Sequence, residues 1–600
     1  MQNSRYITLV TLTLFLALTS KTYSGEDTTK QWAQKTLKHL TLEEKIGQLF
    51  ISATIIDQEG KEDFKRKIIH NIDKTSIAEL VKKHHIGGVL FLRKLSTPKK
   101  QLLLTNTLKK LTKLPLFIAQ DLEWGLAMRL YNTIKFPHNM TLGAIKNNSG
   151  LLYSLGKEIA RQCKLIGVNI NFAPVVDINS NPKNPVIHMR SFGDNPQLVA
   201  QKATALMQGL QDGGVIACAK HFPGHGDTSV DSHLDLPTIS HSLELLQKRE
   251  LHPFKELIKA GIISIMTGHL QVPALEKTPN TPATLSKNNI THLLKKTLHF
   301  KGLAITDALN MRGVLKHHTP GELELQALHA GNDILLCPTD TPKAIAHIKK
   351  AIQNGEFSLK ELDNRVLKIL YTKAWILHKS RANNTQDNNT LEQKLHTPYA
   401  YTLKQTLFDH AITVVQNKDN LIPLTKAPHT TVTYIEIGKH KVSSYDATHQ
   451  HTVSQLCATL EKYITLQTHT LPTNPTQEQV EKLFLKLHNT HILLIGVYSI
   501  SNNILHFIAK LSAQKKNKNI ILALFDSPYN LQYFKNIPTI IQAYEDDPCA
   551  ETAVANILLG KLTPTGVLPV CYNRKIAETQ LTHLKKFGKR LSDEEAAQLI

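Results

Sequence analysis

The stretch from Lys220 to His233, KHFPGHGDTSVDSH, concentrates three histidines and two aspartates within fourteen residues. Side chains of these types hold metal ions, transfer protons or shape a loop through hydrogen bonds. His221 and His225 stand four residues apart, as in helical zinc sites, but the proline and glycines around His225 oppose a helix. A metal held by loop ligands is therefore the less favoured alternative, and we predict no metal and no cofactor.

Asp231 and His233 form the second chemical feature of this stretch. One residue separates them, so an extended segment places both side chains on the same side. A carboxylate that accepts a hydrogen bond from one imidazole nitrogen fixes the tautomer and makes the other nitrogen more basic. The spacing therefore favours His233 as a general acid and base oriented by Asp231, although a surface histidine beside an unrelated aspartate would have the same spacing.

Short apolar, β-branched runs alternate with longer runs of helical periodicity between about residues 40 and 355. The strand candidates are 47–55, 86–92, 114–120, 168–176, 215–220, 262–268, 302–307 and 332–337. The helix candidates between them include 98–112, 148–165, 195–211, 242–260 and 286–299. Eight such units in succession, with strands that are apolar on both faces, favour a closed (β/α)8 TIM-type barrel over an open sheet.

Polar or charged residues come directly after, or end, several of these strands. They are Asp121, Asp177, Lys220 with His221, His269 and Asp307. Such a residue can simply end a strand, but barrel enzymes place their chemistry where the carboxyl ends of the strands meet. Asp307, opposite a proton donor on a loop, suits the formation and hydrolysis of a glycosyl-enzyme. Partners for sugar hydroxyls are supplied by Asp121, Arg190, Lys220 and His221.

Five stretches of the predicted barrel carry a resemblance to a known family. They are DLEWGLAMR (121–129), NFAPVVDINSNPKNPVIHMRSFGD (171–194), KHFPGHGDTSVDSH (220–233), ITDALNM (305–311) and AGNDILL (330–336). With them the chain resembles glycoside hydrolase family 3, specifically its beta-N-acetylglucosaminidase (beta-N-acetylhexosaminidase) branch in the two-domain form. The resemblance covers almost the whole predicted barrel. Less specific motifs, AITVVQNKDNLIPL and GVLPV, extend it into the second half.

The resemblance implies an exo-acting, retaining glycoside hydrolase that removes terminal beta-linked N-acetylglucosamine. Asp307 would be the nucleophile, and His233 the acid and base, with Asp231 orienting it. The matching substrate-binding residues are Asp121, Arg190, Lys220 and His221, and His269 is added from its strand-end position alone. The chain departs from the family pattern at Ala308, where many relatives have a second acidic residue, and in EWG, which replaces the commoner EGG.

The chain of 600 residues is too long for one hydrophobic core, and two domains are expected. We predict a signal peptide (1–24), the barrel (30–378), a polar linker (379–404), an α/β domain (405–573) and a charged helical tail (574–600). Strands 411–416, 431–438, 491–499, 519–525 and 539–545 alternate with helices near 475–488, 501–515 and 549–559. This alternation favours an open, mostly parallel α/β sandwich as the second domain.

The first residues have the features of a secretory signal peptide: one arginine, an apolar run, and then small polar residues. An uncleaved anchor is the alternative, although the run is shorter than the ~20 residues that a spanning helix needs. We therefore expect an exported bacterial protein, periplasmic or secreted, without a stable membrane span after cleavage.

The net charge of +22 would suit a nucleic-acid binder, but the lysines and arginines are spread along the chain without a basic stripe. A nucleic-acid partner is therefore not expected, and the resemblance implies a carbohydrate partner, either a muropeptide or a chitooligosaccharide. The six cysteines are scattered without a CxxC pair and are predicted to be buried thiols. The pattern leaves the oligomeric state open.

Three other functions fit parts of the sequence. A beta-glucosidase of the same family generally takes its acid/base carboxylate from the second domain and lacks the GHGDTSVDSH loop. A phosphorylase would also use a histidine, because an uncharged imidazole does not repel phosphate as a carboxylate would. An inactive cell-wall sugar-binding protein would keep the pocket without the reacting groups, whereas Asp307, Asp231 and His233 are all present.

Overall fold

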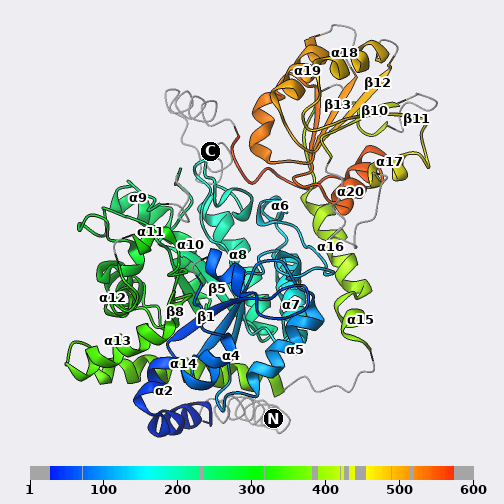
Figure 1. Cartoon of the computed structure of the whole chain (residues 1–600). Helices are drawn as coiled ribbons and strands as arrows, with labels where there is room; N and C mark the ends of the chain where they lie inside the picture. The colour runs from blue at the N-terminus through cyan, green and yellow to red at the C-terminus, as the bar shows by residue number, and fades with distance from the viewer. Residues whose placement is uncertain are drawn as a thin grey trace, which may run out of the picture.

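The computed structural model describes residues 28–70, 72–229, 235–316, 318–381, 389–418, 420–424, 432–439, 454–487, 490–513 and 519–572. These residues form a barrel and a second α/β domain that lies against one side of it (Figure 1). The predicted signal peptide and the predicted charged tail lie outside the described residues.

Eight parallel strands form the barrel sheet in the order β7-β6-β5-β4-β3-β2-β1-β8. The strands are β1 (Phe50–Ile55), β2 (Gly88–Leu92), β3 (Phe117–Gln120), β4 (Ile170–Asn171), β5 (Ile216–Phe222), β6 (Ser264–Thr267), β7 (Leu303–Thr306) and β8 (Leu335–Leu336). A parallel bridge between Ile305 and Ile334 brings β7 beside the segment before β8, so the ring is nearly closed. The predicted barrel is confirmed, and its strands are apolar because helices cover their outer faces.

The helices around the barrel follow the predicted order (Figure 1). They are α2 (Leu42–Gly47), α3 (Phe64–Ile69), α4 (Ile77–Lys83), α5 (Pro98–Lys109), α6 (Asn139–Gly143), α7 (Ser149–Leu165), α8 (Pro196–Asp212), α9 (Leu243–Lys248), α10 (Leu251–Lys259), the π-helical η4 (Asn288–Thr297), α11 (Arg312–Leu315), α12 (Glu322–Ala330), α13 (Thr341–Gln353) and α14 (Leu359–Arg381), with 3-10 turns η1 (Leu126–Met128), η2 (His188–Arg190) and η3 (Ala283–Leu285).

Two predicted elements are shorter or divided in the structure. The predicted helix 242–260 consists of α9 and α10, because Pro253 is tolerated only in a first helical turn and α10 begins two residues before it. The predicted strand 168–176 contributes only two residues to β4. Pro174 cannot donate to the ladder, and beyond β4 the chain pairs with β5 only through an isolated parallel bridge between Val175 and Lys220.

The second domain is a six-stranded sheet in the order β11-β10-β12-β13-β14-β9, with only β9 antiparallel to its neighbour. The strands are β9 (Thr413–Asn417), β10 (Val432–Ile437), β11 (Leu466–Leu471), β12 (Ile492–Val497), β13 (Ile520–Leu524) and β14 (Thr539–Gln542). The helices α17 (Gln455–Leu460), α18 (Gln477–Lys486), α19 (Asn502–Ala513) and α20 (Pro548–Leu558) accompany it, with the 3-10 turn η6 (Pro528–Tyr533). Tyr434 and Ile435 show the alternation of the sheet, because they enter separate hydrophobic clusters.

The predicted polar linker contains ordered helix. Helix α14 continues to Arg381, and α15 (Leu391–Leu395) and α16 (Pro398–Ala411) follow before β9. A threonine precedes each of α15 and α16 as its N-cap, and its side chain accepts a hydrogen bond from a backbone nitrogen of the first turn. Figure 1 shows α15 and α16 along the side of the barrel, leading to the second domain.

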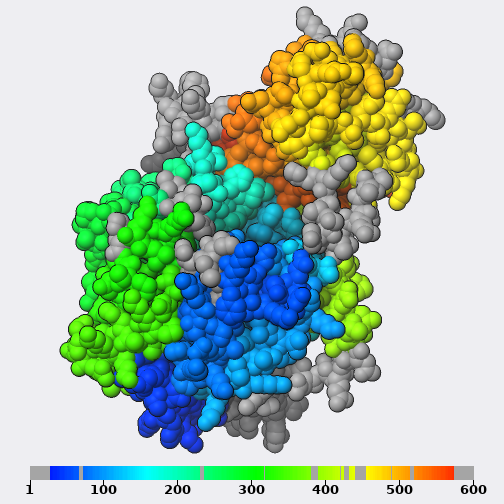
Figure 2. Space-filling view, in the orientation of Figure 1, coloured from blue at the N-terminus to red at the C-terminus, as the bar shows by residue number. Residues whose placement is uncertain are grey.

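The second domain covers one sector of the barrel surface. In Figure 2 its orange residues adjoin the cyan residues of the barrel, which include α6. All six cysteines are free thiols; Cys163, Cys218, Cys337 and Cys457 are buried, and Cys549 and Cys571 are half-buried. Across the described residues, no helix combines the length and the apolar character needed to span a bilayer.

Candidate active site

The carboxyl ends of the barrel strands surround a cavity of about 600 Å³. Its charged and polar lining consists of His70, Arg93, Asp121, Glu123, Arg129, Arg190, Lys220, His221, His225, Asp307, Asn310 and Arg312. The cavity thus brings together five of the predicted site residues, Asp121, Arg190, Lys220, His221 and Asp307. Strand ends far apart in the sequence supply four of them, and Arg190 comes from the 3-10 turn η2, as expected for this end of a barrel.

Lys220 is a buried cation with two carboxylate partners. It lies near the end of β5, is only 2% exposed, and places Nζ 2.8 Å from Asp121 Oδ1 and 2.9 Å from Glu123 Oε1. Burial alone would lower the pKa of Lys220, but the two carboxylates raise it above its ordinary value. The ammonium group therefore stays charged inside the site.

Two arginines complete this network. Arg190 donates from Nη2 and Nε to the Glu123 carboxylate at 2.8 and 3.0 Å, and Arg129 donates from Nη2 to Asp121 Oδ2 at 2.9 Å. Burial alone would raise the pKa of Glu123, but Arg190 and Lys220 lower it to about 2. Lys220 and Arg129 likewise outweigh burial and hold the pKa of Asp121 well below its usual range. Both carboxylates are therefore ionised at neutral pH.

Asp177 orients His221 from below the cavity. The Asp177 side chain is fully buried, and its Oδ2 lies 2.7 Å from His221 Nδ1. Its Oδ1 accepts from the backbone nitrogens of His221 and His225 at 3.1 and 2.7 Å. Because an ionised carboxylate can only accept, Nδ1 of His221 carries a proton, and Nε2 is the nitrogen left for the cavity.

His225 belongs to the framework of the loop. Its Nδ1 lies 2.9 Å from Thr228 Oγ1, and its carbonyl accepts from Asn184 Nδ2 at 2.9 Å. Burial and then the nearby His221 lower the pKa of His225 to about 4, so the ring is neutral at pH 7. A side chain at Gly226 would begin 1.6 Å from the carbonyl oxygen of Ile178, so glycine is required there. The described part of this loop contains no helix, as its proline and glycines predict.

Asp307 follows β7 directly and lines the cavity. Its backbone nitrogen donates to Thr267 O at 2.9 Å, and its Oδ1 accepts from Ala308 N at 2.8 Å. The expected sugar contact of His269 needs correction, because His269 is fully buried and is not among the described residues that line the cavity. Its Nδ1 and Nε2 lie 3.0 Å from Thr284 Oγ1 and from Ala308 O, so it supports the backbone beside Asp307.

The predicted proton-transfer pair, Asp231 and His233, lies outside the described residues. Its role therefore stays a prediction. In the described ranges, no group of three or more histidine, cysteine, aspartate or glutamate side chains is arranged to hold a metal ion.

The sequence analysis assigned no role to Glu123 and Arg129, although both stand in the motif DLEWGLAMR after β3. Glu123 is only 2% exposed and joins Lys220 to Arg190. A signal existed: acidic residues two apart after a strand, followed by an arginine, place several charges at one end of the barrel. The pairing itself depends on β5 and on the 179–194 segment, which local sequence does not reveal.

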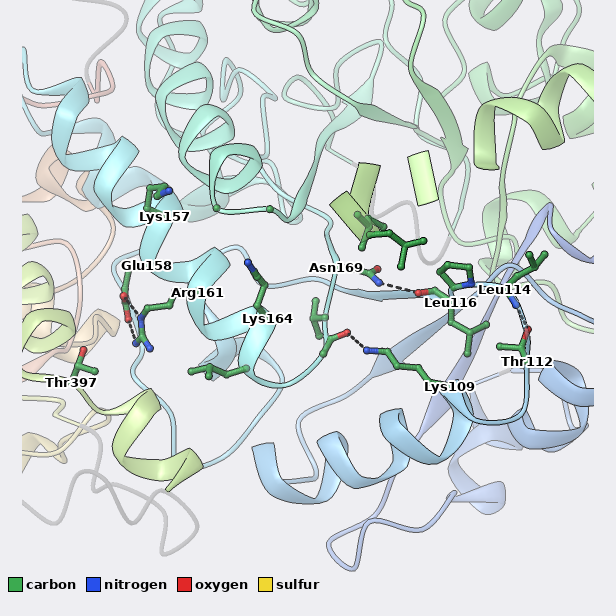
Figure 3. Close-up of a pocket in the computed structure, with 18 of the residues that line it drawn as sticks. Lys109, Thr112, Leu114, Leu116, Lys157, Glu158, Arg161, Lys164, Asn169 and Thr397 are labelled. Atoms are coloured by element: carbon green, nitrogen blue, oxygen red, sulfur yellow. Dashed lines mark hydrogen bonds and ion pairs between the residues drawn. The ribbon is translucent and has the colours of Figure 1, made fainter. Parts of the chain in front are cut away.

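A second, larger cavity of about 1140 Å³ lies at the amino end of the barrel (Figure 3). Leu116 and Asn169, which precede β3 and β4, line it together with the cations Lys109, Lys113, Lys157, Arg161 and Lys164. Among the described residues that line it, the one carboxylate is that of Glu158, which accepts two hydrogen bonds from Arg161 at 2.8 and 2.6 Å. Neither Asp121 nor Asp307 lines this cavity, so the chemistry belongs to the smaller one.

Comparisons with known proteins agree with this geometry. The model of the glycosyl hydrolase family 3 N terminal domain matches residues 41–372. A beta-hexosaminidase A of Pseudoalteromonas piscicida is 35% identical over 377 residues, which cover 58% of this chain and 62% of that protein. A beta-N-acetylglucosaminidase/beta-glucosidase of Cellulomonas fimi is 24% identical over 92% of this chain and 98% of its own length.

Among solved structures, a glycoside hydrolase family 3 beta-N-acetylglucosaminidase from Paenibacillus sp. str. FPU-7 is similar, with a TM-score of 0.73 and 30% identity. The match covers 89% of this chain and 99% of that one, so both domains take part. The barrel with its charged carboxyl end is thus that of a glycosidase. This chain belongs to glycosyl hydrolase family 3.

Proposed function

We propose that this protein is an exo-acting, retaining glycoside hydrolase that removes terminal beta-linked N-acetylglucosamine from peptidoglycan fragments or chitooligosaccharides. The proposal rests on one observation: Asp307 lines the same cavity as Lys220 and its two carboxylate partners. A carboxylate at the end of a barrel strand, facing a preorganised set of donors and acceptors, suits attack on a bound sugar. The beta-hexosaminidase relatives support the choice of sugar.

The ion-pair network would bind the non-reducing sugar. Asp121 is ionised and accepts hydrogen bonds from hydroxyl groups, while Arg190 and Lys220 donate to them. His221, held by Asp177, offers Nε2. Because these groups already pair with one another, little reorganisation is needed when the sugar enters.

The reaction would proceed in two displacements. In the first, Asp307 forms a bond to the anomeric carbon, the glycosidic bond breaks, and His233 gives its proton to the departing oxygen. In the second, His233 takes a proton from water, the water oxygen attacks the anomeric carbon, and the Asp307 carboxylate is released. Asp231 would orient His233 in both steps. Two inversions at one carbon give net retention.

A panel of chromogenic substrates tests the proposal. The purified protein, without added metal, should cleave a 4-nitrophenyl beta-N-acetylglucosaminide faster than the corresponding beta-glucoside, and proton NMR should show the beta anomer as the first product. Preferred cleavage of the glucoside would favour the beta-glucosidase alternative. Formation of a sugar 1-phosphate in phosphate buffer would favour a phosphorylase, and no turnover of any member would leave the sugar-binding protein.

The leaving group distinguishes the role of His233. The His233→Ala variant should lose far more activity on poor leaving groups than on 4-nitrophenol, because only poor leaving groups need a proton. Similar losses on both would contradict the acid role. We also propose export to the periplasm or the medium, which the signal-like first residues support and which fractionation of the producing cells would test.

A further inference from the structure

The segment that carries Arg190 is held by the second domain as well as by the barrel. This segment, residues 179–194, lies between β4 and α8 and includes η2. Arg190 points one way into the cavity, to Glu123. Asn179, His188 and Asp194 of this segment contact residues of the second domain.

Glu545 makes the most extensive of the interdomain contacts. It follows β14 and is 5% exposed, and its carboxylate accepts four hydrogen bonds from the barrel. Oε2 lies 2.9 Å from Lys135 Nζ and 2.8 Å from His138 Nδ1. Oε1 accepts from the backbone nitrogen of His138 at 2.7 Å and from Thr141 Oγ1 at 2.6 Å. One buried carboxylate therefore fixes the start of α6.

Helix α6 passes this constraint to Arg190. Asn139, the first residue of α6, donates from Nδ2 to the carbonyl oxygen of Arg190 at 2.6 Å. The next contact is steric: a side chain at Gly143 would begin 1.8 Å from the carbonyl oxygen of Phe192. Two sets of hydrogen bonds thus connect Glu545 to the backbone of Arg190, one from Glu545 to the start of α6 and one from Asn139 to Arg190 O. Asn139 is only 3% exposed, so this connection is buried.

Two further contacts act on the segment directly. Ser527 Oγ lies 3.1 Å from Nε2 of His188, which adopts a left-handed backbone with φ of 34°. The hydroxyl of Tyr529 accepts from Asn179 Nδ2 at 2.8 Å and donates to Asn179 O at 3.1 Å. Both Ser527 and Tyr529 follow β13, so the carboxyl edge of the second sheet faces the segment.

The last described residues of the second domain contact the other end of the segment. The backbone nitrogen of Asp194 donates to Pro569 O at 3.2 Å, and Cys571 N donates to Asp194 Oδ2 at 2.8 Å. A side chain at Gly193 would begin 2.3 Å from Pro569 O. Contacts at both ends and in the middle leave the segment little freedom to move without moving the second domain.

We infer that the second domain positions Arg190 in the sugar pocket, and that Glu545 is the positioning residue through which most of this effect passes. The inference rests on the proposed role of Arg190 in binding the sugar. Glu545 touches neither the cavity nor Arg190; it holds α6, and α6 holds the Arg190 backbone. Because the guanidinium must meet both Glu123 and a hydroxyl group, a small shift of the backbone weakens both interactions.

Glu545→Gln is the test variant, and Glu551→Gln is its matched control. Glu551 is also a buried glutamate, 1% exposed, but its partners Lys439, Tyr498, Ser454 and Gln455 all belong to the second domain. Each substitution keeps the side-chain shape and removes one buried charge. A general loss of stability should affect both variants, whereas loss of positioning should affect only Glu545→Gln.

Two measurements are made on the full chain. Hydrogen exchange by mass spectrometry should show at least ten-fold faster exchange across residues 186–194 in Glu545→Gln and no change there in Glu551→Gln. For hydrolysis of a 4-nitrophenyl beta-N-acetylglucosaminide, KM should rise about ten-fold in Glu545→Gln while kcat stays within three-fold, and both should be unchanged in Glu551→Gln. If Glu545→Gln does not fold, the milder Ser527→Ala takes its place. It should raise KM and the exchange rate across residues 186–194 by about two-fold.

The outcomes separate this inference from the proposed function. Unchanged exchange across 186–194 in Glu545→Gln, or equal changes in both glutamate variants, would overturn the inference even if the wild type is an active hydrolase. In an Arg190→Ala background, a further ten-fold rise of KM on Glu545→Gln would also overturn it, because Glu545 would then act by another route. Faster exchange in a protein that cleaves no glycoside would refute the proposed function and leave the coupling of the domains intact.

Discussion

Two buried lysines at opposite ends of the barrel have opposite surroundings. Lys220, at the carboxyl end, has the carboxylates of Asp121 and Glu123 within 2.9 Å, and its pKa is raised. Lys373, on α14 at the amino end, is fully buried and has Gln48 Oε1 at 2.6 Å and the Phe117 ring at 5.0 Å. Burial lowers the pKa of Lys373 to about 7.

The two ends of the barrel thus differ in how they treat a buried lysine: one end stabilises its positive charge, and the other buries it at a cost in stability. At the carboxyl end, carboxylates keep the cation charged beside the cavity, which is useful for recognising a polar substrate. At the amino end, a single neutral acceptor satisfies the amine without compensating its charge. The first lysine should therefore matter for activity, and the second should reduce stability without affecting activity.

Among the variants that test this contrast between the two ends, the largest effect is expected from Lys220→Met. Removing the cation leaves Asp121 and Glu123 facing one another with only their arginines, and it removes a donor to the sugar. We expect kcat/KM to fall about 10³-fold, equivalent to ~4 kcal/mol of transition-state stabilisation. Initial rates on the chromogenic glucosaminide measure this. An equal loss in Lys373→Met would abolish the contrast between the two ends.

Glu123→Gln should have the next largest effect, on stability. The pKa of Glu123 is lowered from 4.5 to about 2, so the ionised group stabilises the folded state above pH 4.5 by on the order of 3 kcal/mol. This contribution is lost as the pH falls from 4.5 to 2. Urea unfolding should show a large deficit of the variant at pH 7 that shrinks across that window.

Glu79→Gln is the control for this series, since Glu79 pairs with Lys83 on the exposed surface. It should leave the urea midpoint of unfolding unchanged at pH 7 and at pH 3. A constant deficit of Glu123→Gln from pH 7 to pH 3 would mean that the charge of Glu123 is not what stabilises the site.

Lys373→Met should have the smallest effect on stability, and it should stabilise the fold where Glu123→Gln destabilises it. The folded state binds its proton only below about pH 7, whereas an unfolded lysine binds one up to 10.5, so folding is penalised most at or below pH 7. The variant should be more stable than the wild type by about 2 kcal/mol at pH 7, after loss of the bond to Gln48. This advantage should vanish as the pH rises toward 10.5, with kcat/KM unchanged throughout. A variant less stable than the wild type at pH 7 would show that the Lys373 amine contributes more than its burial costs.

The sequence predicted the architecture better than the details of each element. Apolar runs such as 302–307 and 519–525 lie close to β7 and β13, because strands buried on both faces are continuously apolar. Strand β11 was missed, since Leu466–Leu471 is polar and mostly exposed at the sheet edge. The helices α15 and α16 were assigned to a linker because the neighbouring Asn-rich stretch dominated the local composition.

For the site, the residues at strand ends were predictable and their partners were not. Asp121, Lys220 and Asp307 follow or end apolar runs, and the closure of the barrel brings them together. Glu123 and Glu545 act through pairings with residues 67 and more than 400 positions away, and no local pattern marks such pairs. His269 shows the limit of position alone, because a strand-end side chain can face the backbone rather than the cavity.

Trapping the intermediate on Asp307 tests the central claim most directly. The protein is mixed with an N-acetylglucosaminide that carries a very good leaving group, quenched with acid, digested and analysed by mass spectrometry. In the wild type, we expect one added N-acetylglucosaminyl group on the peptide that contains Asp307. In Asp307→Ala, we expect no labelled peptide and a turnover loss of about 10⁴-fold or more. Label on another residue, or undiminished turnover in Asp307→Ala, would contradict it.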